Sequence, residues 1–435
     1  MRTDFTLVQL ADPEVAEANR ILRSCIHCGM CLATCPTYVV NGDERDSPRG
    51  RIYFIKNMLE SGAAPSPSSV RHLDRCLGCL ACETACPAGV DYGRLLERGR
   101  ARVAADQRRP LVERLLRRFL GRVLPYPARL RALFRLARLG RPVLARLPGR
   151  LGRAAALVPL PPASPAGAGV PRAEGTPVRR VLLLEGCVQQ NLRPAIHGAS
   201  VRLLTRLGCE VVVPEGAGCC GAISQHLGEA DRAKAFARKN LDCWMAAIEE
   251  GCDAIVINAA GCGTMVKDYA ALFQDDPAYR EKAARVASLA QDISEMVEAL
   301  GMPPGRVPPG KAWPSGFTVA YQSACGLHYG QKIGGLPPRL LEQAGFQIAA
   351  LAEPELCCGS AGPYSLLQPA FAEALRERKL RAIEGVTADV VATGNIGCLD
   401  WLSRGSALPV VHVVELLDWA SGGPQPAGIR TLPDG

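Results

Sequence analysis

The sequence contains no apolar run close to the eighteen or so residues that a bilayer-spanning helix needs. Its first residues, MRTDFTLVQLADPEVAEANR, include acidic side chains and lack the apolar stretch of a secretory signal peptide. Charged residues make up 21% and apolar residues 48% of the chain, a globular composition that argues against disorder. We therefore expect a soluble chain in a reducing compartment, the cytoplasm.

Catalytic motifs are also scarce. Neither a Ser/His/Asp arrangement nor a His/Glu metal signature stands out among the six histidines. We identify no dinucleotide-binding glycine fingerprint and therefore expect no flavin on this chain. Hydride removal then has to take place on a partner. The histidines are interpreted as structural or solvent-facing, namely His27, His72, His197, His226, His328 and His412.

Cysteine, in contrast, is abundant, with 19 residues in a chain of 435. Two runs, at 25–36 and 76–87, each read C-x2-C-x2-C-x3-C-P. Bacterial two-cluster ferredoxins use this pattern, and the fourth cysteine of each run binds the cluster of the other run. The runs thus predict two [4Fe–4S] clusters, the first held by Cys25, Cys28, Cys31 and Cys86 and the second by Cys76, Cys79, Cys82 and Cys35.

Two alternatives to this interpretation are weaker. A disulfide scaffold is typical of short secreted chains, whereas this chain is long and its number of cysteines is odd. Zinc also binds C-x2-C pairs, but its four-thiolate sites rarely use this long run twice. Forty residues separate Cys35 from Cys76, more than in a compact ferredoxin, and apolar periodicity predicts helices over 13–22 and 52–59. We therefore expect helices to surround the clusters.

Positive charge is concentrated in one stretch. Residues 94–153 contain 18 arginines and three acidic residues, whereas the net charge of the whole chain is +9. Leucine and phenylalanine recur there at helical spacing, which suits docking to an anionic membrane surface or an acidic partner. The alternative is a solvated arginine face whose leucines pack on the cluster domain, and no nucleic-acid motif accompanies the charge. Four prolines are expected to divide the stretch into short helices: Pro125, Pro127, Pro142 and Pro148.

An internal repeat follows a Pro/Ala/Gly-rich linker. In each copy an apolar strand ends at a cysteine, a second strand leads to Cys-Cys-Gly, and a third leads to another cysteine. In both copies 31 residues separate the first cysteine from the Cys-Cys pair. Short strands that alternate with helical segments indicate βαβ units and a parallel sheet, with the cysteines in loops after the strands. The predicted strands are 181–187, 209–214 and 253–258 in the first copy, and 317–321, 346–351 and 389–393 in the second.

The expected fold class is α+β multidomain. A helical two-[4Fe–4S] ferredoxin domain is followed by two pseudo-symmetric α/β Cys-Cys-Gly lobes. The predicted boundaries are 1–100 for the ferredoxin-type domain, 101–153 for the basic segment, 154–178 for the linker, 179–302 for the first lobe and 315–425 for the second.

The repeat supplies four matched cysteines per lobe. Four thiolates suffice for a further [4Fe–4S] cluster or a zinc ion in each lobe, and thiols without metal are the alternative. The three remaining cysteines, Cys209, Cys243 and Cys252, are interpreted as small buried hydrophobes. The matched cysteines are Cys187, Cys219, Cys220 and Cys262 in the first lobe and Cys325, Cys357, Cys358 and Cys398 in the second.

The chain resembles the family of the glycolate oxidase iron–sulfur subunit nearly from end to end. Heterodisulfide reductase subunits and the small subunit of anaerobic glycerol-3-phosphate dehydrogenase are wider relatives with the same Cys-Cys-Gly repeat. The segments that carry the resemblance are CIHCG (25–29), TCPTY (34–38), DSPRGRIY (46–53), DRCL (74–77), LEGC (184–187), AGCCGA (217–222), GCG (261–263), LCCGSAG (356–362) and ATGNIGC (392–398).

The resemblance implies an oxidoreductase subunit that takes electrons from a flavin-bearing 2-hydroxy acid dehydrogenase partner. It would pass them towards a membrane quinone at the cytoplasmic face of the inner membrane, as part of an acceptor-linked glycolate dehydrogenase. Two departures from the family pattern are present. Ala259 and Asn395 replace the first cysteine of the C-x2-C that ends full boxes, and Gln322-Ser-Ala-Cys325 stands where relatives have His-x-Pro-Cys.

Two other functions fit the same residues. In the first, a group held in the Cys-Cys-Gly lobes performs chemistry, such as disulfide or quinone reduction. In the second, the chain serves a sister complex that oxidises lactate, glycerol 3-phosphate or another hydroxy acid. Substrate choice would then lie in the flavin subunit.

Overall fold

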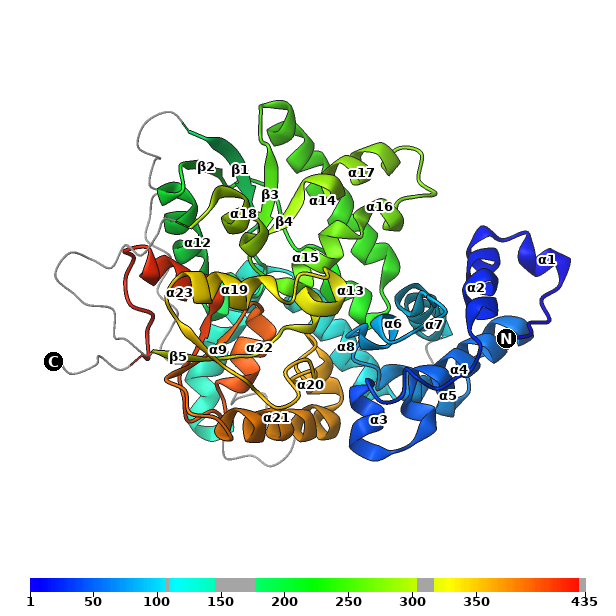
Figure 1. Cartoon of the computed structure of the whole chain (residues 1–435). Coiled ribbons are helices and arrows are strands. Elements are labelled where there is room, and N and C mark those ends of the chain that lie inside the picture. Colours follow the sequence, from blue (N-terminus) through cyan, green and yellow to red (C-terminus); the bar gives the residue numbers. More distant parts are fainter. Residues whose placement is uncertain (107–108, 145–176, 303–316, 430–435) are drawn as a thin grey trace. The chain divides into compact units, whose positions relative to one another are not determined.

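The computed structural model describes residues 1–106, 109–144, 177–302 and 317–429 (Figure 1). The predicted linker, except its last two residues, and residues 145–153 of the basic segment lie outside these ranges. The predicted domain boundaries stay a prediction. The chain divides into two compact units, which we call the helical unit (Met1–Gly121, Ile223–Ala233 and Leu356–Arg378) and the sheet unit (Arg122–Ala222, Lys234–Glu355 and Lys379–Gly435).

The helical unit begins with short helices whose ends are set by local sequence signals. α2 (Pro13–Ser24) starts after Asp12, whose carboxylate accepts a hydrogen bond from the Glu14 N–H. α4 (Pro48–Ser61) starts after Ser47 in the same way and ends at Gly62, which adopts the left-handed conformation. Both predicted helices are thus confirmed. The other elements are α1 (Leu7–Leu10), α3 (Pro36–Asn41), η1 (Glu44–Asp46), α5 (Pro67–Asp74), α6 (Ala81–Thr84), α7 (Tyr92–Asp106) and α8 (Leu111–Val123), with α13 (Ala222–Leu227) and α20 (Tyr364–Leu367) from the later segments.

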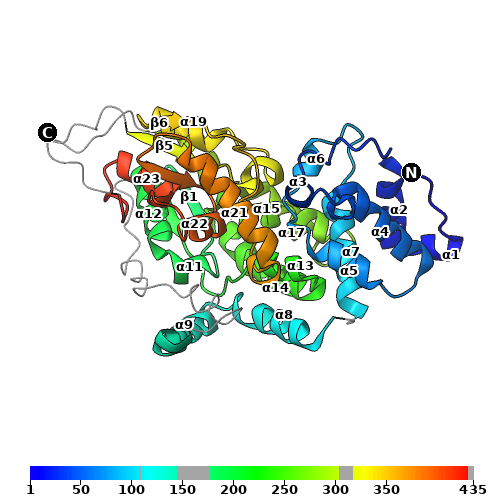
Figure 2. The ribbon, with the colours of Figure 1, turned by 90° about the horizontal axis from the view of Figure 1, so that it is seen from below.

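Helices α2, α4, α5 and α7 pack around one apolar core (Figure 2). Ile21, Ile55 and Leu95 are among its fully buried side chains. α4 and α7 approach closely, because a Cβ on Gly99 would lie 2.9 Å from Cγ1 of Ile55. Burial of one large aliphatic side chain contributes about 1.5–3 kcal/mol. Several of the predicted cluster cysteines belong to the same core, namely Cys25, Cys76 and Cys82.

The sheet unit contains two four-stranded parallel sheets with the same strand order, β2-β1-β3-β4 and β6-β5-β7-β8. Together with the helical N-terminal unit, this confirms the predicted fold class. β3 and β7 read as continuous apolar runs because both are buried throughout. The strands are β1 (Arg179–Leu183), β2 (Cys209–Val212), β3 (Ala254–Ile257), β4 (Ala290–Asp292), β5 (Thr318–Tyr321), β6 (Gln347–Ala349), β7 (Val390–Thr393) and β8 (Val410–His412).

The two lobes of the sheet unit contact each other directly. The Ala260 N–H donates a hydrogen bond of 3.2 Å to the Gly394 carbonyl. α12 lies beside α23, and a buried Asp418 on α23 pairs with Arg202 and Arg206 on α12 (Figures 1 and 2). The helices are α9 (Pro127–Leu144), α11 (Gln189–Leu192), α12 (Pro194–Arg206), α14 (Ala230–Glu249), α15 (Ala260–Lys267), α16 (Tyr269–Leu272), α17 (Arg280–Leu289), α18 (Ile293–Leu300), η2 (Gly326–Gly330), α19 (Leu336–Gln343), α22 (Ile396–Leu402) and α23 (Val413–Ala420). The greater part of a further helix, α21 (Pro369–Glu384), belongs to the helical unit.

Two details differ from the predictions. β4 and β8 were not predicted, and each has only three residues. The predicted helix break at Pro142 is wrong, since this proline lies inside α9. None of the helices in the described ranges has the length and apolar character needed to cross a bilayer.

Candidate iron–sulfur sites

Two cavities in the helical unit are lined by the ferredoxin-type cysteines. The first is lined by the four cysteines assigned to the first cluster. The second is lined by the four assigned to the second. Both cavities also touch Cys82, Pro48 and Tyr92, so that they share a wall. Each cavity thus offers a complete four-thiolate set for one [4Fe–4S] cluster, although the individual ligands stay a prediction.

The two cysteine loops have the same backbone conformation. Two residues after the first cysteine of each run, His27 and Gly78 have φ values of 58° and 68°. Two residues further on, Gly29 and Leu80 have φ values of 82° and 65°. A non-glycine residue in this region is uncommon, although histidine tolerates it better than most. The repeated left-handed positions turn both loops around their cavities, and this equivalence agrees with the repeated sequence pattern.

A buried arginine lies against the second cavity. Arg51 on α4 is fully buried, and its Nη1 lies 3.8 Å from Sγ of Cys35. Its Nε donates a hydrogen bond of 2.7 Å to the His72 carbonyl, and its Nη2 donates one of 3.0 Å to Oγ1 of Thr37. Thr37 Oγ1 also lies 3.3 Å from Cys35 Sγ. The guanidinium is therefore fixed in one orientation beside a predicted cluster ligand.

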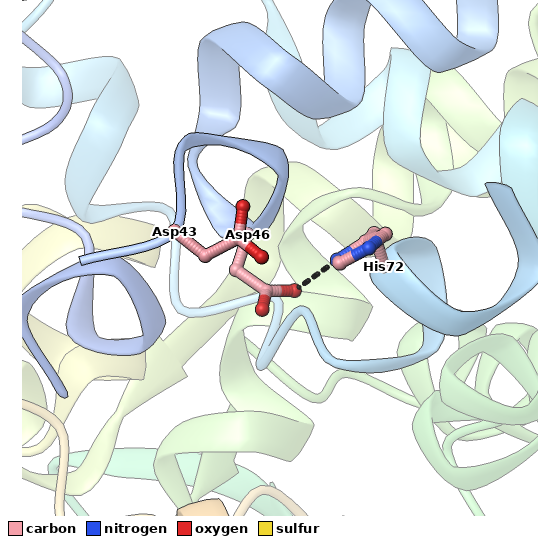
Figure 3. Close-up of side chains that lie close together, drawn as sticks. All are labelled: Asp43, Asp46 and His72. Atoms are coloured by element: carbon pink, nitrogen blue, oxygen red, sulfur yellow. Dashed lines mark hydrogen bonds and ion pairs between the residues drawn. The ribbon is translucent and has the colours of Figure 1, made fainter. Parts of the chain in front are cut away.

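The negative partner of this arginine is Asp46, which is fully buried. Its carboxylate lies 2.7 Å from Nδ1 of His72 (Figure 3). It also lies 2.8 Å from Nη1 of Arg75 and 3.5 Å from Nη2 of Arg51. Asp43, Asp46 and His72 lie close enough together to suggest a metal site. However, Asp46 is surrounded by cationic and N–H groups. We therefore interpret this group as a buried ion network, in which loss of one partner costs roughly 3–5 kcal/mol.

Two further groups act on Cys76. The Tyr92 hydroxyl donates a hydrogen bond of 3.5 Å to its Sγ, and Nη2 of Arg100 donates one of 2.6 Å to its carbonyl oxygen. Burial opposes ionisation of this thiol, but the charges of Arg51 and Arg100 outweigh burial and lower the pKa of Cys76. A thiolate, the form that binds iron, is thereby favoured.

The first cavity has a different electrostatic environment. Arg49, at its rim, donates a hydrogen bond of 3.0 Å to the His27 carbonyl, and its side chain is 24% exposed. The amino group of Met1 donates a hydrogen bond of 2.5 Å to the Cys25 carbonyl in a partly buried contact. Burial raises the pKa of Cys31 to about 11. The cations here are within reach of water, which weakens their field.

These charged and polar neighbours were not predicted from the sequence. The only sequence signal for Arg51 and Asp46 is the DSPRGR segment at 46–51, which is part of the family resemblance. The interpretation of the histidines as structural or solvent-facing was likewise incomplete. His226, in a later segment of the helical unit, lies beside Gly78, where a Cβ would be 3.4 Å from its Cε1. Burial, followed by the charge of Arg100, lowers the pKa of His226 to about 4, so that it is neutral at physiological pH.

In the first lobe, the four matched cysteines follow three adjacent parallel strands. Cys187 follows β1, Cys219 and Cys220 follow β2, and Cys262 lies in the first turn of α15 after β3. The carboxyl ends of such strands meet at one edge of the sheet. Hydrogen bonding to Cys219, followed by burial, raises the pKa of Cys187. Hydrogen bonds to Cys219 and Cys262, followed by burial, raise that of Cys220. The fold therefore brings all four thiols together.

The loop that carries Cys219 and Cys220 is held by two side chains. Asn240 Nδ2 donates a hydrogen bond of 3.0 Å to the Cys219 carbonyl, and the Tyr269 hydroxyl donates one of 2.7 Å to the Cys220 carbonyl. The Gly221 N–H points at Cys219 Sγ, 3.4 Å away, with Gly221 at φ 97°. Such hydrogen bonds around a thiol orient it for a metal.

The same loop does contain the letters of a dinucleotide-binding glycine fingerprint, which the sequence was said to lack. Residues 216–221 read GAGCCG and follow β2, so the letters do match the G-x-G-x-x-G fingerprint. Two of the six positions are buried cysteines that belong to the four-thiol group. The match therefore has its explanation in the cysteine site, and the absence of flavin stays an expectation.

In the second lobe, the structure describes the matched cysteines in two places. Cys325 follows β5 and Cys398 lies in the first turn of α22, both in the sheet unit, whereas Cys357 and Cys358 belong to the helical unit. Asn395 Nδ2 lies 3.5 Å from Sγ of Cys398, so that an amide replaces a thiol at this point of the box. Burial, followed by the negative charge of Cys357, raises the pKa of Cys79, a predicted ligand of the second cavity.

Comparison with known proteins agrees with this architecture. Residues 24–90 match the model of a 4Fe-4S dicluster domain, and residues 181–267 and 319–403 each match a cysteine-rich domain. The chain is 40% identical over 425 residues to the glycolate oxidase iron-sulfur subunit of Escherichia coli, covering 97% of this chain and 99% of that protein. The chain belongs to the glycolate oxidase iron–sulfur subunit family. This confirms the resemblance and the expected [4Fe–4S] cofactors.

Two more distant relatives align with different lengths of this chain. A probable glycolate oxidase iron-sulfur subunit of Bacillus subtilis is 31% identical over 425 residues, covering 92% of this chain and 94% of that protein. Lactate utilization protein A of Shouchella clausii is 29% identical over 246 residues, which is 55% of this chain and 98% of that protein. The whole architecture is thus shared with the glycolate oxidase subunits and only part of it with the lactate protein.

Proposed function

We propose that this chain is the electron-transfer subunit of a complex that oxidises glycolate to glyoxylate. It receives electrons from a flavin-bearing 2-hydroxy acid dehydrogenase subunit and passes them towards a membrane quinone. The observation that carries this proposal is the pair of four-cysteine cavities with a common wall. [4Fe–4S] clusters bound there would supply one-electron transfer. The chain itself binds them and sets the charge around both.

The proposed ligands follow the cavity linings and the pattern of two-cluster ferredoxins. The four thiols of the first lobe are proposed to hold a further [4Fe–4S] cluster or a zinc ion, because the hydrogen bonds among them bring them together at one edge of the sheet. The proposed sets are Cys25, Cys28, Cys31 and Cys86; Cys35, Cys76, Cys79 and Cys82; and Cys187, Cys219, Cys220 and Cys262. Cys325, Cys357, Cys358 and Cys398 are the corresponding proposal for the second lobe.

Glycolate is favoured as the substrate of the complex for a specific reason. The two relatives that share nearly the whole chain are named for glycolate oxidase, whereas the relative named for lactate utilization shares about half of it. Substrate binding itself belongs to the dehydrogenase partner in this proposal. A related hydroxy acid complex is therefore the alternative.

We place the chain at the cytoplasmic face of the membrane, with α8 as the element that meets the bilayer. Leu111, Val112, Leu115 and Phe119 lie on one side of α8 and are 47–69% exposed. Arg118 is exposed along the edge of this apolar stripe. An exposed apolar stripe with arginines beside it suits an anionic lipid surface, where the stripe enters the interface and the charges meet lipid head groups.

The test of the proposed function uses the isolated, cluster-loaded chain and an artificial electron acceptor. We expect no glycolate oxidation by this chain alone, and bleaching of its cluster absorbance when the flavin subunit and glycolate are added anaerobically. Glycolate oxidation without a flavoprotein would overturn the proposal, and so would a flavin subunit that turns over glycolate but leaves this chain oxidised.

A second function is favoured by the gathered thiols of the first lobe. A group held by Cys219 and its neighbours could reduce a disulfide or a quinone directly. Replacement of Cys219 or Cys357 by alanine would then abolish turnover of the complex while the ferredoxin-type clusters remain reducible. Normal turnover in both variants would remove this alternative.

A further inference from the structure

We infer that Arg51 is a positioning residue that raises the reduction potential of the cluster held by Cys35, Cys76, Cys79 and Cys82. Its guanidinium is fully buried, and its Nη1 lies 3.8 Å from Cys35 Sγ in the wall of the second cavity. The inference rests on the ligands proposed above for that cavity. It does not depend on the electron donor or acceptor of the complex.

The physical reason is the sign of the charge that reduction adds. Uptake of one electron makes the site one unit more negative, without any bond being formed or broken and without a proton being taken up. Burial disfavours this added charge, because the low dielectric of the interior solvates it poorly. A fixed positive charge in contact with a ligand sulfur stabilises the reduced form, and the potential rises.

The surroundings hold this charge in place. Three separate contacts, to the His72 carbonyl, Thr37 and the Asp46 carboxylate, orient the guanidinium, so it cannot turn away from the sulfur. Asp46 does not simply cancel it, because that carboxylate is also shared with Arg75 and His72. Removal of Arg51 and removal of the Asp46 charge therefore change the net charge of this network in opposite directions.

The same helix supplies a matched control. Arg49 lies two residues before Arg51 on α4 and lines the first cavity, but its side chain is 24% exposed and pairs with Glu44 at 2.7 Å. Water and this ion pair screen its charge. Its removal should therefore leave the potential of the second cavity unchanged.

The experiment is a potentiometric titration of the cluster-loaded full chain, with dithionite as reductant and EPR as the readout. In Arg51→Gln we expect one midpoint potential to fall. At a fixed ambient potential the ratio of reduced to oxidised cluster should drop about tenfold, which is about 59 mV for a one-electron couple. Arg49→Gln should not move this midpoint. In Asp46→Asn, which removes a negative charge from the same network, the same midpoint should rise.

The opposite signs separate an electrostatic role from a merely structural one, since loosening of the packing would shift both variants in the same direction. Unchanged midpoints in Arg51→Gln, or shifts of equal sign in Arg51→Gln and Asp46→Asn, would overturn the inference. If Arg51→Gln does not retain its iron, two other variants test the inference. Arg51→Lys must keep the midpoint close to that of the wild type, and Asp46→Asn must raise it. The titration contains no partner subunit, so a negative result for Arg51 leaves the proposed role in glycolate oxidation intact. Equally, failure of the glycolate proposal leaves the role of Arg51 intact.

Discussion

The hydroxyl of Tyr92 donates a hydrogen bond of 3.5 Å to Sγ of Cys76, from a side chain that is only 3% exposed. Hydrogen bonds to ligand sulfurs stabilise the more negative, reduced state of a cluster. We therefore expect Tyr92→Phe to lower the same midpoint potential that Arg51 controls, by less than Arg51→Gln does. Potentiometric titration with EPR detection measures this shift in midpoint potential.

The control for this prediction is Tyr53→Phe, because Tyr53 on α4 is 53% exposed. Iron content should equal that of the wild type in both variants. A midpoint that stays the same in Tyr92→Phe, with the hydroxyl gone, would show that this hydrogen bond does not reach the redox centre.

Iron and acid-labile sulfide per chain distinguish the occupancy of the cysteine sites. Two clusters require about eight of each, and a further cluster in the first lobe requires about twelve. If the first lobe is occupied, Cys219→Ala should lose about four irons and four sulfides. Cys243→Ala should lose none, since Cys243 on α14 belongs to no four-cysteine group. About eight of each in the wild type, unchanged in Cys219→Ala, would mean that the lobe holds no cluster.

Asp292 predicts a pH dependence of stability. It is buried at the start of α18, where its carboxylate accepts a hydrogen bond of 2.9 Å from the Ser294 N–H. Burial raises the pKa of this carboxyl from 3.8 to about 6. The folded chain thus holds the proton more tightly than the unfolded chain, and the resulting stabilisation is full below pH 3.8 and is lost as the pH rises through about 6.

Between pH 5 and pH 8 we expect the wild type to lose about 1 kcal/mol of unfolding free energy through this group. Asp292→Asn keeps the capping oxygen but does not titrate, so that it should lack this loss. Urea unfolding followed by tryptophan fluorescence at both pH values measures the difference. The exposed Asp231→Asn serves as the control, and equal pH dependence in Asp292→Asn and the wild type would refute the prediction.

The proposed membrane face of α8 can be tested by vesicle sedimentation. In the double variant Leu115→Ser and Phe119→Ser, we expect at least about tenfold weaker binding to phosphatidylglycerol-containing vesicles, because two exposed apolar side chains no longer enter the interface. The matched control is Leu136→Ser with Leu139→Ser on α9, whose side chains are 68% and 83% exposed.

Salt should weaken the binding of the wild type, and vesicles of phosphatidylcholine alone should bind less protein. Equal binding by the two double variants would exclude α8 as the docking element. A wild type that does not sediment with any vesicle would exclude the membrane position itself.

Local spacing predicts three cysteines of each ferredoxin-type group, and the pattern of two-cluster ferredoxins predicts the fourth. Gaps of two residues bring three thiolates of one loop together wherever that loop lies, and the same left-handed positions recur in both loops. The repeat could also be predicted from the sequence, because its strands are short apolar runs at matched distances from cysteines. The three-residue strands β4 and β8 were not predicted, and the structure identifies them by their parallel pairing with β3 and β7.

The sequence by itself therefore determined that two parallel-sheet lobes follow a helical cluster domain, and it predicts which cysteines form each group. Only the tertiary structure decided what surrounds those groups. Nothing in the residues near Arg51 shows that it turns inward to Cys35, 16 positions earlier, and is held there by Asp46 and the His72 carbonyl. Neighbouring residues in the sequence define the cysteine pattern. The electric field around those cysteines comes instead from charges that folding brings together from distant segments and removes from water.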